Sequence, residues 1–206
     1  MPDSVGTNAV YLVGRIAKAP EYCYDRRGYH MYEGLIDVPR RSGACDRLPF
    51  ILPRELIGGL TEEMCVALSG SMHHRDRHRY PDVALRLAAD VDSVSPASPS
   101  WCENRVELSG NLCMPPKFRT TPFGREVCEL TIAIPNGYGP QEYIFCIAWG
   151  GLARFAANLS TGAAVHAEGR FQSRPYDKAL PGGQQIERTA LEVSLYRLTD
   201  KRRAPA

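Results

Sequence analysis

The chain has 206 residues, 44% hydrophobic and 23% charged, which are proportions of an ordinary globular protein with one large domain or two smaller ones. The formal net charge is only +2, so bulk charge gives no argument for nucleic-acid binding and any electropositive site must be local. Seven scattered cysteines without a CxxC pair argue against a disulfide framework or zinc site, and the lack of a leader-like N-terminus or long apolar run favours a cytoplasmic protein without membrane contact.

An internal repeat divides the chain. A shift of 96 positions superimposes a series of landmarks: Asn8 on Asn104, Val10 on Val106, Gly14 on Gly110, Pro20 on Pro116, Gly28 on Gly124 and Ile36 on Ile132. We therefore expect two copies of one unit, over residues 1–94 and 104–200. Residues 95–103, rich in Pro and Ser, are the expected linker, and residues 201–206 form a basic tail.

The first copy is expected to run strand, strand, strand, short helix, strand, strand. Gly14 interrupts its first strand, as Gly110 does in the second copy, which indicates a bulge or bend. The third strand, RLPFILP (residues 47–53), alternates cleanly. It points Leu48, Phe50 and Leu52 inward, and its outward residues are Arg47, Pro49, Ile51 and Pro53.

The second copy repeats this order, with strands at about 104–113, 126–135, 142–149, 163–174 and 185–196 and a helix at 151–159. Five strands with a helix between the third and fourth is the order of the five-stranded Greek-key barrel called the OB-fold. The predicted fold class is therefore all-β, with two tandem OB-folds, each carrying one short helix between strands 3 and 4.

The third strand of the second copy is apolar on both faces. Tyr143, Phe145, Ile147 and Trp149 alternate with Ile144, Cys146 and Ala148. Because a small barrel buries only one face of a strand, the other face must be covered by another strand layer, a partner chain or a ligand with flat faces.

Four motifs of the second copy carry a resemblance: NRVELSGNL, PPKFRTTPFG, the junction AWGGLARFAANL and AEGRFQSRPY. In this order and spacing the segment 104–200 resembles the bacterial single-stranded DNA-binding protein family, and it is also similar to primosomal replication protein N. The first copy keeps NAVYLVGRI and the Pro20 and Gly28 landmarks but has lost much of the middle.

The resemblance implies a set of site residues. Trp149, Tyr143 and Tyr176 match the positions on which the family stacks bases, and each stack contributes about 1–3 kcal/mol whatever the base. Packing at an interface is the alternative for these rings. Phe145 lies on the same face, whereas Phe171 and Phe118 are more typical of barrel-closing residues, although Phe171 stays a candidate contact. The candidate phosphate ligands are Arg119, Arg125, Arg154, Arg170, Arg174 and Lys178.

The first copy differs at these positions. Arg47 and Pro53 stand where the second copy has Tyr143 and Trp149, so the stacking platform is lost and charge is gained, with Arg47, Arg54 and Arg75 as candidate contacts. His73, His74 and His78 lie in the stretch HHRDRHR, but its adjacent cations disfavour a metal, and we favour a solvated basic loop. No metal or cofactor is expected.

These features predict a non-enzymatic protein that binds single-stranded DNA in replication, recombination or repair, since no Walker loop, paired carboxylates or nucleophile elbow is present. Stacking does not read the 2′-hydroxyl, so RNA stays open as a ligand. We expect a homo-oligomer, with a homodimer carrying four barrels favoured. The alternative is a primosome-like accessory or adaptor whose barrel faces bind replication proteins.

Overall fold

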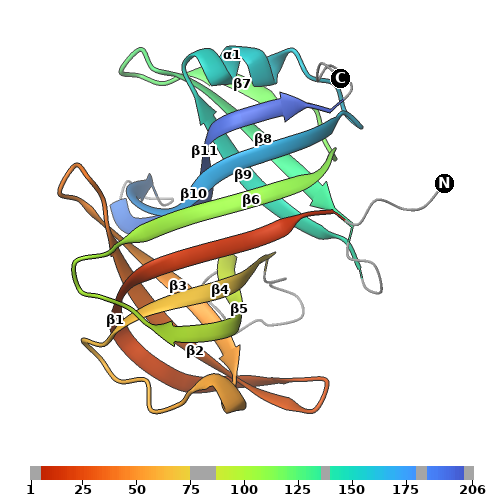
Figure 1. Ribbon diagram of the computed structural model, residues 1–206. Coiled ribbons are helices and arrows are strands. Elements are labelled where there is room, and N and C mark those ends of the chain that lie inside the picture. Colours follow the sequence, from red (N-terminus) through yellow and green to blue (C-terminus); the bar gives the residue numbers. More distant parts are fainter. Residues whose placement is uncertain (1–5, 75–86, 136–139, 180–184, 202–206) are drawn as a thin grey trace.

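The computed structural model describes residues 6–74, 87–135, 140–179 and 185–201, whose strands form one eleven-stranded sheet that closes on itself twice (Figure 1). The first ring contains β1 (Asn8–Arg26), β2 (Tyr29–Pro39), β3 (Cys45–Pro53), β4 (Cys65–His74) and β5 (Leu87–Pro96). Around this ring the order is β1, β2, β3, β5, β4 and back to β1. We call it the first barrel.

The second ring repeats this order with β6 (Glu103–Leu112), β8 (Glu126–Ile134), β9 (Glu142–Trp149), β11 (Gln185–Asp200) and β10 (Ala164–Ala179). An additional short strand, β7 (Lys117–Thr120), pairs with β8. We call this ring the second barrel. The predicted all-β class, with a closed five-stranded barrel and a short helix, is confirmed. β10 and β11 extend beyond the predicted ends as a long antiparallel ribbon that pairs Ala179 with Gln185.

The two copies differ in their helix. The second barrel has the predicted helix, α1 (Gly151–Ala157), with Ala153 and Ala156 in the core. In the first copy the corresponding segment is a single 3-10 turn, η1 (Arg54–Leu56). The turn stops there because Gly58 and Gly59 follow with φ of 45° and 77°, a backbone conformation that ends a helix. No helix in the described ranges is both long and apolar enough to cross a membrane.

Gly14 and Gly110 mark the place where the first strand of each barrel crosses a neighbour. A Cβ atom on Gly14 would lie 2.3 Å from the Asp37 carbonyl oxygen, and one on Gly110 would lie 2.2 Å from that of Ala133. Both contacts are far too short, so glycine is required for this close approach of two backbones. The predicted special role of the two glycines therefore has a steric cause.

The barrels meet along β1 and β6, which pair antiparallel in the middle of the molecule (Figure 1). Val10 pairs with Val106, its own counterpart in the repeat, so the two copies are related by an approximate twofold axis at this pair. A contact between an asparagine side chain and a backbone occurs in both copies. The Asn8 amide bonds the Met72 backbone at 2.8 and 2.9 Å, and the Asn104 amide bonds the Phe171 backbone at 2.6 and 2.8 Å.

Candidate nucleic-acid interface

β9 carries a row of rings on the outside of the second barrel. Ile144, Cys146 and Ala148 point inward and are fully buried, which leaves the alternate residues outside. Tyr143 is 49% exposed, and Phe145 and Trp149 are half-buried. Ile147 lies between these rings with 2% exposure, so the row is apolar along its whole length.

A small hollow adjoins this row at Phe145. It is lined by Met114, Pro115, Lys117, Glu129, Leu130, Thr131 and Phe145. Its position follows from the sequence, because Pro115 and Pro116 have no N–H to donate and the chain leaves the sheet between β6 and β7. An aromatic wall, an ammonium group and a hydroxyl thus face one concave space.

Further rings lie on the neighbouring ribbons of the second barrel. Tyr176, on β10, is 41% exposed, and Phe118, on β7, is 43% exposed. Phe123, in the turn after β7, is 91% exposed and was not singled out from the sequence. The signal that could have identified it is a phenylalanine between Pro122 and Gly124, inside a turn that has no access to a core.

The prediction that Phe171 touches a ligand is wrong. Its side chain is fully buried in the barrel core, and its backbone pairs with Val193. β10 alternates around it, so that Arg170 and Gln172 point away from the core while Phe171 closes the barrel. Arg170 is the neighbour of Phe171 in the sequence, but the two side chains lie on opposite faces of β10.

Four of the candidate cations are already engaged with carboxylates. Arg119 pairs with Glu129 at 2.8 Å, Arg174 with Glu192 at 3.4 Å, and Arg154 with Glu126. In the first barrel Arg47 forms two hydrogen bonds with Asp37, at 2.9 and 2.8 Å, which raise the pKa of this guanidinium. A phosphate would have to compete with these carboxylates for the arginines.

The remaining candidates differ from these. Arg125 and Arg54 are exposed and form no ion pair with any residue that the structure describes. Arg170 donates to the Gln172 side chain at 3.3 Å, and burial together with the nearby charge of Arg40 lowers its pKa. The backbone of Lys178 is part of β10, but its side chain is not among the parts that the structure describes. Arg75 lies outside the described residues.

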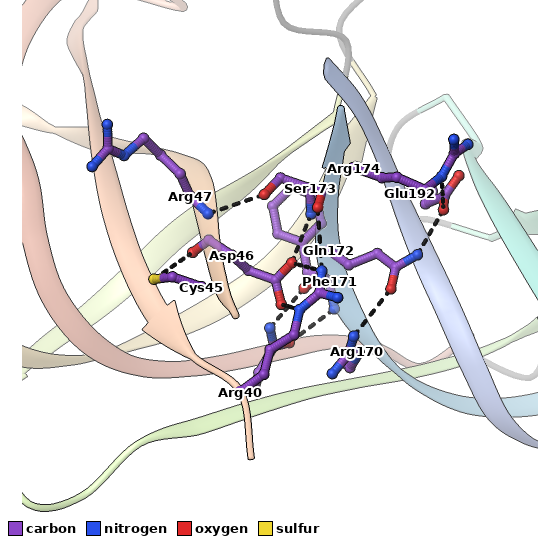
Figure 2. A network of polar contacts seen from close by, with 11 residues as sticks. Arg40, Cys45, Asp46, Arg47, Arg170, Phe171, Gln172, Ser173, Arg174 and Glu192 are labelled. Atoms are coloured by element: carbon purple, nitrogen blue, oxygen red, sulfur yellow. Dashed lines mark hydrogen bonds and ion pairs between the residues drawn. The ribbon is translucent and has the colours of Figure 1, made fainter. Parts of the chain in front are cut away.

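A buried carboxylate joins the two barrels (Figure 2). Asp46, at the start of β3, is 1% exposed and accepts hydrogen bonds from Arg40 and from the backbone N–H of Ser173 at 2.9 Å. Ser173 also accepts the backbone N–H of Arg47 with its hydroxyl at 3.0 Å. Because Ser173 lies on β10, these bonds tie the first barrel to the second.

The approximate twofold repeats this contact with different chemistry. Glu142, at the start of β9, is the counterpart of Asp46, and it accepts the backbone N–H of His74 on β4 at 3.5 Å. The cation beside it is His73, whose Nδ1 lies 2.9 Å from a Glu142 oxygen. His73 and His74 therefore belong to the contact between the barrels and not to a free loop, and His78 lies outside the described residues. Within those residues no cluster of potential metal ligands is found.

Known proteins are similar to this chain, some over its second half and some over nearly all of it. Residues 103–198 match the single-strand binding protein family. Single-stranded DNA-binding protein 3 of Listeria innocua is 40% identical over 81 residues, which cover 36% of this chain and 51% of the relative, so the match spans about half the length of that protein. The single-stranded DNA-binding protein of Deinococcus radiodurans is 25% identical over 228 aligned positions, covering 91% of this chain and 75% of the relative.

Among solved structures, the wild-type single-stranded DNA binding protein from Thermus aquaticus superimposes with a TM-score of 0.73 at 21% identity. The superposition covers 98% of this chain and 97% of the other, so both barrels share that fold. The match to the single-strand binding protein family, over residues 103–198, coincides with the second barrel.

Proposed function

We propose that the chain binds single-stranded DNA on the outer face of the second barrel, by stacking and phosphate contact and without catalysis. The observation that carries this proposal is the row formed by Tyr143, Phe145 and Trp149, large rings on the outside of a strand whose inner face already fills the core. Leaving such rings in contact with water costs free energy, and a strand of unstacked bases offers flat apolar faces to cover them.

Stacking makes the binding tolerant of sequence, because every base has a π face. Each stacked base contributes about 1–3 kcal/mol, so two or three rings account for useful affinity without any reading of base edges. Tyr176 extends the aromatic surface onto β10, whereas Phe118 pairs with the core-facing Cys128 and so lies on the opposite face of the sheet from the row. The single strand is proposed to follow the row and Tyr176.

Phosphate contacts come from the cations around this surface. Arg125, without a carboxylate partner among the described residues, is the first candidate, and Arg119, Arg154 and Arg174 would exchange a carboxylate for a phosphate. Each neutralised phosphate releases condensed counterions, so affinity should fall as salt rises, with a slope near −0.7 per contact for single strands.

We further infer that the two barrels are tandem OB-fold domains, 1–94 and 104–200, with a linker over 95–103 and a basic tail over 201–206. The two barrels have the same order of strands, which supports this inference. We propose a homodimer, which would present four barrels and two of the aromatic rows. Replication, recombination or repair is the proposed setting, and the primosome-like accessory remains the alternative.

The test is a fluorescence titration of the full chain with oligo(dT). Trp101 is 46% exposed and contacts the Tyr11 ring, so it would add signal of its own, and the titration uses a Trp101→Phe chain in which Trp149 is the only tryptophan. We expect saturable quenching that weakens with added salt. Emission that oligo(dT) leaves unchanged, together with no salt-sensitive binding in a filter assay, would contradict the proposal.

A further inference from the structure

The two barrels offer structurally equivalent outer faces, which can be compared position by position. β3 pairs with β5 through Ile51 and Asp90, and β9 pairs with β11 through Ile147 and Ser194. Along the third strand, Arg47, Pro49, Ile51 and Pro53 correspond to Tyr143, Phe145, Ile147 and Trp149. The first face thus keeps its central isoleucine and has no rings of its own.

The first face is covered by its own chain. Met31, Ile51 and Ala88 are buried in a cluster separate from the barrel core, with exposures of 1%, 0% and 0%. Cys23 and Tyr24, from the end of β1, pack against this cluster. The hairpin of β1 and β2 therefore lies on the outside of β3 and β5, where the sister barrel presents its aromatic row.

An ion pair fastens this hairpin. Arg26, the last residue of β1, donates to both carboxylate oxygens of Asp90 on β5, one of the bonds measuring 3.0 Å. Their side chains are only 33% and 18% exposed, so water competes weakly for the pair. The hairpin is also tightly turned, since Arg27 and Gly28 have φ of 51° and 84°, as a two-residue turn between paired strands requires.

The second barrel has the corresponding hairpin, β7 with the start of β8, but lacks the residues that hold it over the outer face. In the 96-residue repeat Pro122 replaces Arg26 and Thr120 replaces Tyr24. Ser194 occupies the place of Asp90 beside the central isoleucine. Pro115, where the first copy has Ala19, takes the chain out of the sheet before β7 and opens the hollow beside Phe145.

We propose that the Arg26–Asp90 ion pair holds the β1–β2 hairpin closed over the first barrel, so that single strands reach the outer face of the second barrel only. This inference rests on the proposed function for the ligand, while the closure itself is a property of the free chain. Each chain would then have one aromatic row that single-stranded DNA can reach, and one equivalent face that the chain's own hairpin covers.

Alkylation of Cys23 tests the closure, because its half-buried thiol donates to the Met31 carbonyl at 3.2 Å under the hairpin. The full chain is treated with iodoacetamide and the reacted cysteines are mapped by mass spectrometry, with exposed Cys102 as internal reference. We expect Cys23 to react more slowly than Cys102, and Asp90→Ala to raise its rate about tenfold. The matched control is Glu63→Ala. It removes an exposed carboxylate that pairs with Arg15, which lies on β1 like Arg26, and it should leave the rate at Cys23 unchanged.

A second arm repeats the alkylation in the Trp101→Phe chain with saturating oligo(dT) while Trp149 fluorescence is recorded. We expect quenching with an unchanged rate at Cys23. Rapid reaction of Cys23 in the unaltered chain, no response to Asp90→Ala, or an oligo(dT)-dependent change at Cys23 would overturn the inference. A failure of the proposed function is distinct, since it would abolish quenching while the difference between Asp90→Ala and Glu63→Ala persisted.

Discussion

The two barrels share one strand order and differ in what covers the outer face of their third strand. In the first, Ile51 lies under Met31 and a hairpin from the same barrel. In the second, Ile147 lies between the half-buried rings of Phe145 and Trp149, and Tyr143 on the same face is 49% exposed. The comparison teaches that the central isoleucine of this face is buried in either copy, and that the first copy packs it against residues of its own chain.

The junction between the barrels differs in the same way. Asp46 and Glu142 occupy equivalent positions and accept equivalent backbone N–H groups. Asp46 is neutralised by an arginine that keeps its charge at every accessible pH, whereas Glu142 faces a histidine. One contact therefore pairs a carboxylate with a guanidinium, and the other pairs a carboxylate with an imidazole nitrogen.

The largest expected effect breaks the Asp46 contact. Asp46→Ala leaves Arg40 partly buried without its carboxylate and should reduce the free energy of unfolding by about 3 kcal/mol. Urea denaturation measures this loss. Glu142→Ala is the matched variant and should cost about 1 kcal/mol, because the Glu142 side chain is 19% exposed against 1% for Asp46, so water screens its contact more. Equal losses in the two variants would refute the asymmetry of the junction.

The next effect separates the two faces. Trp149→Ala should weaken oligo(dT) binding by about 2 kcal/mol, since one stacking partner is removed, and should leave the salt slope nearly unchanged. Pro53→Ala alters the equivalent position of the first barrel and should leave affinity unchanged. Fluorescence anisotropy of a labelled oligonucleotide measures both. A comparable loss in Pro53→Ala would show that the first face takes part in binding.

A smaller effect concerns acid. Burial alone would raise the pKa of Glu142, but the hydrogen bond and charge of His73 and the backbone N–H of His74 bring it below the ordinary 4.5. A lowered pKa gives stability that is present above pH 4.5 and is lost as pH falls through the lower value in the folded state. The free energy of unfolding should therefore fall more steeply below that pH in the unaltered chain than in Glu142→Gln, by about 1 kcal/mol or less. Parallel acid profiles would contradict this.

The smallest effect distinguishes free from engaged cations. Arg125→Ala should reduce the slope of log affinity against log salt by about 0.7, the value for one phosphate on a single strand. Arg119→Ala should reduce it less, because Glu129 already compensates that charge in the free protein. Binding isotherms at several salt concentrations measure both slopes. A larger change for Arg119 would mean that its ion pair opens on binding.

The repeat and the alternation of RLPFILP predicted the barrel order and the inward faces, because burial imposes a period of two on a strand whatever its partners. Alternation also placed Ile51 outside, which is correct, but it gave no sign that Tyr24 and Met31 cover that residue, since the cover comes from distant positions. Phe171 is barrel-closing, as its residue type favoured, and its burial rules out the candidate ligand contact. The pairing of Arg47 with Asp37 or Arg174 with Glu192 likewise depends on register across strands, which composition does not encode.

The antiparallel pairing of β1 with β6 has a consequence for assembly. In a protein made from separate single barrels, such a contact forms between molecules and its occupancy depends on protein concentration. Here Val10 and Val106 belong to one chain, so the partner strand is supplied at a fixed effective concentration and dilution cannot remove it. The pairing also uses up strand edges that would otherwise be open to other chains, which protects a freshly made or highly diluted molecule from exchange and from edge-to-edge aggregation.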